Sequence, residues 1–178
     1  ASHRTDRPYM CVGTAASMDG YTAFGASITY QGSKQTFDCP APTAVVADLD
    51  VICAAPGDMN AWGYADLLAK VPAGADWILA DALGLDEIHQ EAWAIVQGRL
   101  RELISDPAGV RRRDPAAIGK LIEGLMLGGF AMQSARSSRA SRRRATTSTG
   151  ATEVVSDRRD RRRDPILRLG SVTMTRRI

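Results

Sequence analysis

Histidine, cysteine and aromatic residues are all scarce in this sequence. Among 178 residues there are two histidines (His3 and His89) and three cysteines (Cys11, Cys39 and Cys53), and aromatic residues make up 6%. An odd number of cysteines without paired spacing argues against a disulfide scaffold and favours a reducing compartment, so we expect a cytoplasmic protein. A catalytic zinc site usually has three protein ligands, which two distant histidines and unpaired cysteines do not supply convincingly.

Long hydrophobic runs are also absent from the sequence. No apolar run approaches the roughly 20 residues of a membrane-spanning helix. The first eight residues lack the apolar core of a signal peptide. These absences predict a soluble protein with no membrane partner. The sequence does not begin with methionine, and we interpret it as an internal fragment of a longer protein.

Basic charge is scarce in most of the chain and concentrated at its end. Residues 1–135 carry 10 basic and 16 acidic side chains, whereas residues 136–178 carry 13 arginines and 4 acidic side chains. The end segment has no helical or strand periodicity, which predicts a disordered basic tail. Its arginine clusters could bind nucleic acid by counterion release. Because no aromatic residue is interleaved among them, a basic-tailed nucleic-acid-binding protein is the less favoured alternative.

Hydrophobic periodicity divides the chain into a strand-rich first part and a helical second part. Up to about residue 52 we expect buried strands at 9–12 and 43–47, and a hairpin of strands 26–30 and 34–37. Helices are expected over 56–70, 75–83 and 86–104, and from Asp114-Pro115 to beyond 127, with Gly128-Gly129 weakening or kinking the last one. The fold class is therefore an α/β strand segment followed by an all-α segment, as at the junction of two domains.

A loop of small residues follows the first predicted strand and carries one carboxylate. Its small side chains let a ligand approach the backbone, and the hydroxyls of Thr14 and Ser17 can donate to phosphate or ribose oxygens. Asp19, before Gly20, could accept hydrogen bonds from a polyol. The alternative is an ordinary strand-to-hairpin loop in which Asp19 forms an Asx-turn, and local evidence alone favours that alternative.

A second carboxylate, Asp66, shares a helical face with Met59, Trp62 and Ala69. An unpaired charge on an apolar face is costly to bury, so this carboxylate needs a partner, and a divalent metal would serve. The alternative is a surface ion pair with Lys70 at i,i+4 spacing, which contributes a few tenths of a kcal/mol. The apolar spacing modestly favours a functional role for Asp66.

Several stretches occur together in the order of a known family. These are P-Y-M-C-V-G-T-A-A-S-M-D-G-Y-T from residue 8, A-P-T-A-V-V-A-D-L-D-V-I from residue 41, A-P-G-D-M-N-A-W-G-Y-A-D-L-L-A-K from residue 55, and A-D-W at 75–77. They resemble the sn-glycerol-1-phosphate dehydrogenase family, including its AraM-like members. That family lies within the dehydroquinate synthase and iron-containing alcohol dehydrogenase superfamily. The resemblance runs from about residue 8 to 139.

The resemblance implies a two-domain, dehydroquinate synthase-like enzyme with its active site in the cleft between the domains. Residues 1–52 would end the nucleotide-binding α/β domain, 53–139 would begin the helical metal-binding domain, and 140–178 would be the basic tail. The implied reaction is hydride transfer between NAD(P)H and glycerone phosphate to give sn-glycerol 1-phosphate. The implied cofactors are NAD or NADP and a divalent metal, zinc or nickel. A homo-oligomer is a possible assembly.

The resemblance also assigns roles to individual residues. Asp19 matches an aspartate that contacts substrate, and Asp66 matches a metal ligand that also touches substrate. The residues that match the dinucleotide-contacting loop are Thr14, Ala15, Ala16 and Ser17. Related activities on the same fold, those of glycerol dehydrogenase or dehydroquinate synthase, stay open as alternatives.

The resemblance ends where the family would supply its histidines. After Ser141 the family continues with glycine, a small residue, glutamate and a metal-binding histidine, but this chain has Arg142-Arg143-Arg144-Ala145. With assumed GC-rich codons, deletion of a single base restores the family's residues. We therefore interpret residues from about 142 as a frameshift product, and we expect weak or no dehydrogenase activity because one aspartate cannot hold the metal.

Overall fold

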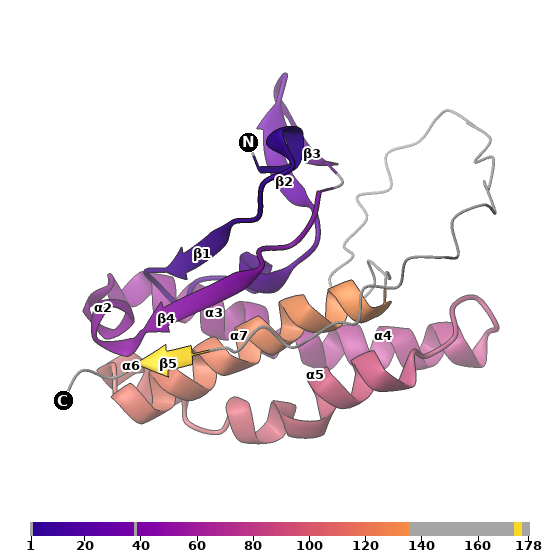
Figure 1. Cartoon of the computed structure of the whole chain (residues 1–178). Helices are drawn as coiled ribbons and strands as arrows, with labels where there is room; N and C mark the ends of the chain where they lie inside the picture. The colour runs from indigo at the N-terminus through magenta and orange to yellow at the C-terminus, as the bar shows by residue number, and fades with distance from the viewer. Residues whose placement is uncertain (1, 38, 136–172, 176–178) are drawn as a thin grey trace.

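The computed structural model describes residues 2–37, 39–135 and 173–175 (Figure 1). The elements, in chain order, are α1 (Ser2–Thr5), β1 (Met10–Gly13), the 3₁₀-helix η1 (Gly20–Thr22), β2 (Ala26–Tyr30), β3 (Ser33–Phe37), β4 (Ala44–Asp48), α2 (Leu49–Ala54), α3 (Gly57–Leu68), α4 (Lys70–Ala82), α5 (Gln90–Leu103), α6 (Pro107–Arg112), α7 (Pro115–Ala135) and β5 (Thr173–Thr175). The predicted order of strands followed by helices is confirmed up to α7. The strand-rich part ends earlier than expected, because α2 begins at Leu49, where the Asp48 carboxylate accepts hydrogen bonds from the backbone N–H groups of Asp50 and Val51.

A small parallel sheet forms one side of the molecule. β1 pairs with β4 in parallel, with Met10 opposite Ala44, and β4 pairs with β5 in parallel, with Val46 opposite Thr173. Among the described strands the order is β1-β4-β5. β5 lies in the end segment, for which we expect no helical or strand period beyond a few residues, and its three residues do not test that expectation. The rest of the predicted tail lies outside the described residues.

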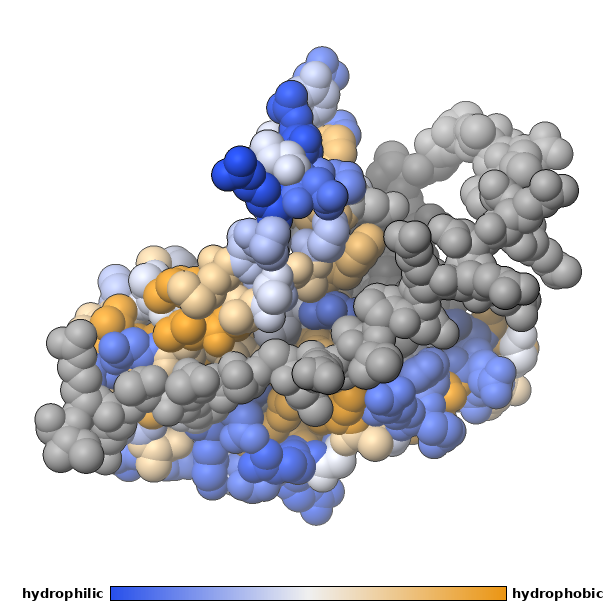
Figure 2. All heavy atoms as spheres, viewed as in Figure 1, coloured by the Kyte–Doolittle hydropathy of each residue, from blue (hydrophilic) through white to orange (hydrophobic). Residues whose placement is uncertain are grey.

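The strands β1 and β4 differ in burial. The prediction of a buried strand at 43–47 is confirmed, because Val45 and Ala47 of β4 are buried. The same prediction for 9–12 is wrong, since Met10 and Val12 of β1 are exposed. The space-filling view shows apolar side chains gathered over this part of the sheet (Figure 2). β1 is an edge of the described sheet, so only β4 and the helices cover it, and its outer face is open.

The predicted hairpin is confirmed and extends from the body of the molecule (Figure 1). β2 and β3 are antiparallel, and Tyr30 pairs with Ser33 across a two-residue turn. Gln31 and Gly32 occupy that turn with φ of 50° and 79°. Two consecutive positive φ angles are typical of a type I′ turn, whose twist matches the strands of a hairpin. The hairpin is almost entirely exposed.

The predicted helix over 56–70 is observed as α3, but its predicted apolar face is wrong. Trp62 is 60% exposed, whereas Gly63 and Leu67 are buried. The buried positions continue to Lys70, so they follow a helical stripe one residue away from the predicted one. Packing of this stripe against α7, and not the size of Trp62, decides which face is covered.

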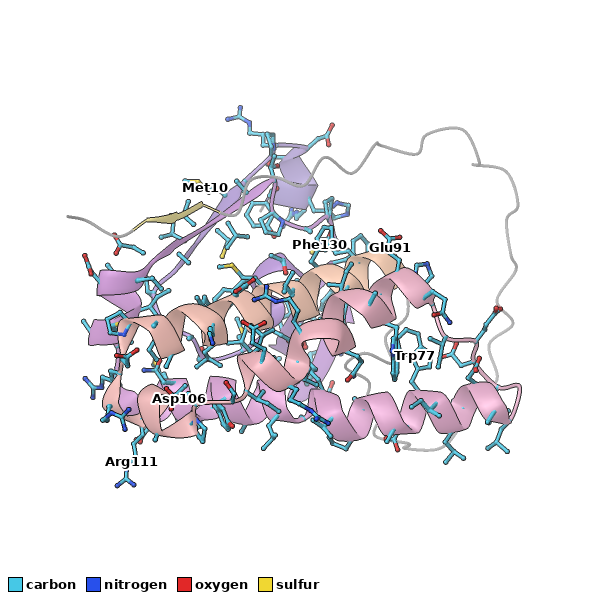
Figure 3. The ribbon with its side chains drawn as sticks, turned by 90° about the horizontal axis from the view of Figure 1, so that it is seen from below. Met10, Trp77, Glu91, Asp106, Arg111 and Phe130 are labelled. Carbon is cyan, nitrogen blue, oxygen red and sulfur yellow. The ribbon has the colours of Figure 1, made fainter. Side chains whose placement is uncertain are left out.

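α3 and α4 follow each other along the chain, and a proline explains the break between them. The helix predicted at 75–83 begins already at Lys70, so a single residue, Ala69, separates it from α3. Pro72 has no backbone N–H and cannot donate to the carbonyl of Leu68, which interrupts the helical hydrogen-bond ladder at this point. Side-chain sticks show Trp77 pointing from α4 toward α5 (Figure 3), where its ring centre lies 6.1 Å from that of Trp93.

The other helix starts follow from capping groups. α5 begins at Gln90, after the start predicted at residue 86, because His89 caps it by accepting the Ala92 N–H at Nδ1. The sequence around His89 suggests a position on a solvated helix face. His89 instead precedes α5 and is its N-cap residue. α7 begins at the predicted Asp114-Pro115, where the Asp114 carboxylate accepts from two backbone N–H groups at 3.0 and 3.1 Å.

α7 is the central helix of the hydrophobic core. By length and composition alone, its segment 115–133 could span a membrane, but 56% of that segment is buried inside the molecule. The main core unites residues from the sheet and from the helices: Ala16, Tyr21, Val45, Ala47, Ile52, Leu67, Leu100, Leu103, Val110, Ala117, Ile118, Leu121, Ile122, Leu125 and Met126. The domain boundary at 52/53 stays a prediction.

Candidate functional site

The structure brings together the two carboxylates that the sequence singled out. Asp19 lies in the loop after β1, and Asp66 lies near the C-terminal end of α3, 47 residues later. The backbone N–H of Asp19 donates to Oδ2 of Asp66 at 2.8 Å. Two separate sequence motifs therefore form one site, and the carboxylate of Asp66 fixes the backbone of the loop that carries Asp19.

A lysine joins the two carboxylates. The ammonium group of Lys70 donates to Oδ2 of Asp19 and lies 3.4 Å from Oδ1 of Asp66. The side chain of Lys70 is 5% exposed, against 15% for Asp19 and 32% for Asp66. The i,i+4 pair considered as the alternative for Asp66 is therefore present. It is not a simple surface pair, because its cation is buried and shared with a second carboxylate.

Asp19 does not form the Asx-turn considered for it. It precedes η1, and its side chain makes no capping hydrogen bond to that 3₁₀-helix. Its carboxylate instead crosses to Lys70 at the start of α4. The long-range ion pair satisfies the carboxylate more fully than a local backbone contact does, because the ammonium is buried beside it.

Tyr21 organises the loop predicted to contact a dinucleotide. Its hydroxyl donates to the carbonyl of Ala15, and it accepts the backbone N–H of Ser17 at 3.3 Å. Ala15 and Ala16 are buried, Ser17 is half-buried and Thr14 is exposed. A folded loop with the hydroxyl-bearing Thr14 on its open side suits a ligand that approaches from solvent.

Gly63 lets this loop lie directly on α3. A Cβ atom at Gly63 would be 2.0 Å from the carbonyl oxygen of Ala16, so only glycine is accommodated. Gly63 is one helical turn before Asp66 on the same helix. The close approach therefore sets the distance between the loop and the carboxylate of Asp66.

The pair Gly128-Gly129, expected to weaken or kink the last helix, lies inside α7, which continues through both residues to Ala135. Both residues are within the helix, and both are buried. A Cβ atom at Gly129 would be 2.2 Å from the carbonyl oxygen of Asp19, and one at Gly128 would be 3.3 Å from Cε of Lys70. Thr22 adds a hydrogen bond from its hydroxyl to the carbonyl of Met126 at 2.6 Å. The glycines serve close packing of the Asp19 loop.

Sequence reasoning missed two residues of the site. Lys70 was considered only as a partner of Asp66, and Gln97 was not considered. The side-chain amide of Gln97, on α5, donates to the backbone carbonyl of Lys70 at 2.9 Å. The adjacent glycines of α7 were a usable signal, because a glycine pair inside an apolar helix often marks a close backbone approach.

The described residues do not fit the divalent metal that the resemblance implies. Within those residues, no group of three His, Cys, Asp or Glu side chains is placed to hold a metal ion. Asp66 and Asp19 offer two carboxylates, and a buried ammonium already lies against both. A structural or catalytic zinc site needs at least three protein ligands. The site can bind hydroxyl groups through its carboxylates, but its described donors do not complete a metal centre.

The first 56 residues match a protein-family model described as iron-containing alcohol dehydrogenase. A glycerol-1-phosphate dehydrogenase [NAD(P)+] of Bacillus subtilis is 35% identical over 132 residues, which cover 74% of this chain and 34% of that protein. One of the same name from Methanosarcina mazei is 32% identical over 139 residues, covering 78% of this chain and 39% of that protein. Over residues 1–56 the chain is similar to the iron-containing alcohol dehydrogenase family, and over about three quarters of its length it is similar to glycerol-1-phosphate dehydrogenases.

Solved structures of two glycerol dehydrogenases support the fold. A probable glycerol dehydrogenase from Sinorhizobium meliloti has a TM-score of 0.59 and 18% identity, with 75% of this chain and 41% of that chain covered. A glycerol dehydrogenase from Schizosaccharomyces pombe has a TM-score of 0.53 and 19% identity, with 73% and 36% covered. The predicted fold class is thus confirmed. The chain spans about a third of the length of the curated relatives that it matches.

Proposed function

We propose that this chain carries the loop and carboxylate half of a glycerol-1-phosphate dehydrogenase-type active site. A bound NAD(P)H would supply the hydride that reduces the carbonyl carbon of glycerone phosphate, and a proton would complete the alcohol. The loop from Thr14 to Ser17 is the proposed contact to the dinucleotide. Asp19 and Asp66 are the proposed contacts to the hydroxyl groups of the polyol phosphate.

The hydrogen bond between the Asp19 backbone and Asp66 carries this proposal. It joins the two stretches that match the dehydrogenase relatives, although 47 residues separate them. The Lys70 ammonium contacts both carboxylates as well, so the loop and the carboxylate of α3 are held in fixed positions relative to each other. The alternative activities, those of glycerol dehydrogenase or dehydroquinate synthase, have support only from the fold.

Other attributes of the proposal follow from the relatives. Their printed names include NAD(P), so we propose a nicotinamide dinucleotide as cofactor. The assignment of Asp66 as a ligand of zinc or nickel stays a prediction of the resemblance, because the described residues do not complete its coordination and an ammonium already lies against its carboxylate. A cytoplasmic location and a homo-oligomer are also proposals. The alternative of nucleic-acid binding rests on arginines that lie outside the described residues.

Binding of the dinucleotide tests the proposal. We expect NAD(P)H to bind the chain in isothermal titration, and we expect Thr14→Trp to weaken that binding about tenfold or more, because a bulky ring would fill the open side of the loop. Thr29→Trp is the matched control, since Thr29 is equally exposed but lies on the β2–β3 hairpin. Equal affinity of T14W and the unchanged chain would contradict the assignment of the loop.

Turnover is measured separately by oxidation of NAD(P)H with glycerone phosphate. We expect weak or no turnover, because the described residues lack a complete metal site. Asp66→Asn should remove any activity that is present, while binding of the dinucleotide persists. Robust turnover that survives D66N would refute the proposed role of Asp66.

A further inference from the structure

The proposed reaction does not use Lys70, although Lys70 is the most buried charged residue described. Its ammonium contacts both carboxylates of the site, and its side chain is 5% exposed. Burying a charge in this way is costly unless the charge is paired and hydrogen-bonded. Two carboxylates within reach of one ammonium meet that requirement.

Packing on several sides keeps the ammonium in place. Gly128 of α7 leaves room for Cε of Lys70, because a Cβ atom at Gly128 would lie only 3.3 Å from that carbon. The backbone of Lys70 is held by Gln97 of α5, whose amide packs so closely against Gly74 that a Cβ atom there would be 2.5 Å from it. The backbone and the stem of the lysine are therefore packed between α5 and α7, and the ammonium is directed at the two carboxylates.

One monovalent cation supplied by the protein lies between the two carboxylates of the site. One ammonium faces two carboxylates, and within the described residues no third His, Cys, Asp or Glu joins them. A divalent ion that bound there would have to remove a buried ammonium and then bind with only two carboxylates. Without the ammonium, however, the two carboxylates would repel each other and would attract a hard divalent cation through their oxygens.

We propose that the Lys70 ammonium is the resident cation of the Asp19–Asp66 pair and takes the place of a metal ion. Lys70 is thus a positioning residue: it holds the Asp19 loop against α3 in a metal-free chain. The inference goes beyond the proposed dehydrogenase function, since it concerns charge pairing within the folded chain and is independent of substrate turnover.

Thermal unfolding with and without Mn²⁺ tests this proposal. The midpoint of the unchanged chain should not respond to Mn²⁺ or to a chelator. Lys70→Met keeps the apolar stem but removes the charge, and it should lower the midpoint by about 5 °C or more. Millimolar Mn²⁺ should restore part of that loss in K70M by binding between the two carboxylates. Lys70→Arg should unfold near the unchanged chain and should not respond to Mn²⁺.

Two controls separate this effect from general binding of metal. Lys120→Met removes a half-exposed lysine of α7 that contacts Glu102 away from the site; it should lower the midpoint only slightly and should not create a response to Mn²⁺. The double variant K70M/D66N should lose the rescue. Stabilisation of the unchanged chain by Mn²⁺ that disappears in D66N would overturn the proposal, as would a K70M variant that Mn²⁺ does not stabilise. Failure here leaves the dinucleotide-binding result unaffected, so the two proposals can fail independently.

Discussion

Gly129 shows how strongly one missing side chain can shape this site. The helix α7 approaches the Asp19 loop so closely that a Cβ atom at Gly129 would be 2.2 Å from the Asp19 carbonyl oxygen and 2.5 Å from the hydroxyl oxygen of Thr22. The first of these neighbours is backbone, which cannot rotate away. Glycine in a helix interior normally costs stability, so its presence here reflects the close approach.

Gly129→Ala should therefore destabilise the fold although alanine is the better helix former. Overpacking of a close contact costs about 1–3 kcal/mol, which exceeds the gain of about 1 kcal/mol from helix propensity. Chemical denaturation measures this difference. Gly119→Ala in the same helix is the control: its Cβ atom would meet a Leu49 methyl at 3.7 Å, an ordinary contact, so this variant should be neutral or more stable. Equal behaviour of the two variants would show that the close approach is not rigid.

At the level of residues, the sequence predicts Asp19 and Asp66 but not their cation. The family resemblance marks both carboxylates, and the structure joins them. Lys70 is four residues after Asp66, so a helical pair was foreseeable. Its burial and its contact with Asp19 depend on how the loop, α4 and α7 meet, and no local pattern contains that information.

Among the helices, α5 and α7 are joined by an exposed group of charges. Arg99 of α5 donates from Nε and Nη2 to the carboxylate of Glu102 at 3.1 and 3.2 Å, and from Nη1 to Glu123 of α7. Lys120 of α7 lies 3.9 Å from Glu102. The hydrogen bonds from Arg99 lower the pKa of Glu102, and Lys120 adds a smaller effect in the same direction.

This lowered pKa gives the stability a dependence on pH. A carboxyl group whose pKa is lower in the folded chain contributes stability above its unfolded pKa of about 4.3, and the contribution is lost as the pH falls through the folded pKa. Glu102→Gln should therefore lower the thermal midpoint slightly at pH 7, and the difference from the unchanged chain should shrink as the pH falls below the unfolded pKa of Glu102. If the difference persisted at low pH, the effect of the substitution would not be electrostatic.

A second comparison isolates the role of Arg99 in this pH dependence. In the Arg99→Gln background, the further change Glu102→Gln should have a smaller effect at pH 7, because the main cause of the lowered pKa has been removed. Lys120 should account for what is left. The same loss in both backgrounds would assign the effect to helix propensity and not to the ion pairs.

A helix or strand of this chain can be predicted from the sequence where the residues that determine it lie within the same segment. The start of α7 was predictable because Asp114 caps it and Pro115 follows, both within the segment itself. The hairpin was predictable from its turn residues. The covered face of α3 was not, since it is decided by α7, which lies about 50 residues later in the chain.

On the scale of the whole molecule, β1 presents exposed apolar side chains at an edge of the described sheet. Tyr9, Met10 and Val12 are exposed along an edge of the described sheet. Partial burial raises the pKa of the Tyr9 phenol, and the nearby Cys39 and Cys11 raise it further. Exposed apolar edges of sheets promote association between chains.

The double substitution Met10→Lys/Val12→Lys should therefore reduce self-association. Light scattering over a range of protein concentrations should show a smaller average mass for the variant, with little change in the thermal midpoint, because both side chains already contact solvent. Leu85→Lys is the matched control: Leu85 is also exposed but lies in the connection after α4, away from the sheet. An unchanged mass in the double variant would mean that this face does not drive association.

The overall architecture was only partly accessible from the sequence. Strands followed by helices could be predicted, because each segment has its own periodicity. The parallel pairing of β4 with β5 could not, since it joins segments more than 120 residues apart. The buried character of β1 was overestimated because a short apolar run does not reveal what covers it.

Ala69, the single residue between α3 and α4, has a consequence for movement in this site. Asp66 precedes it and Lys70 follows it, so their ion pair crosses the point where the helical rod is interrupted. Any bend at this joint would change the distance between the two charges. The ion pair between Lys70 and Asp66 therefore restrains bending between α3 and α4. Bending at Ala69 would also separate the charges of the site.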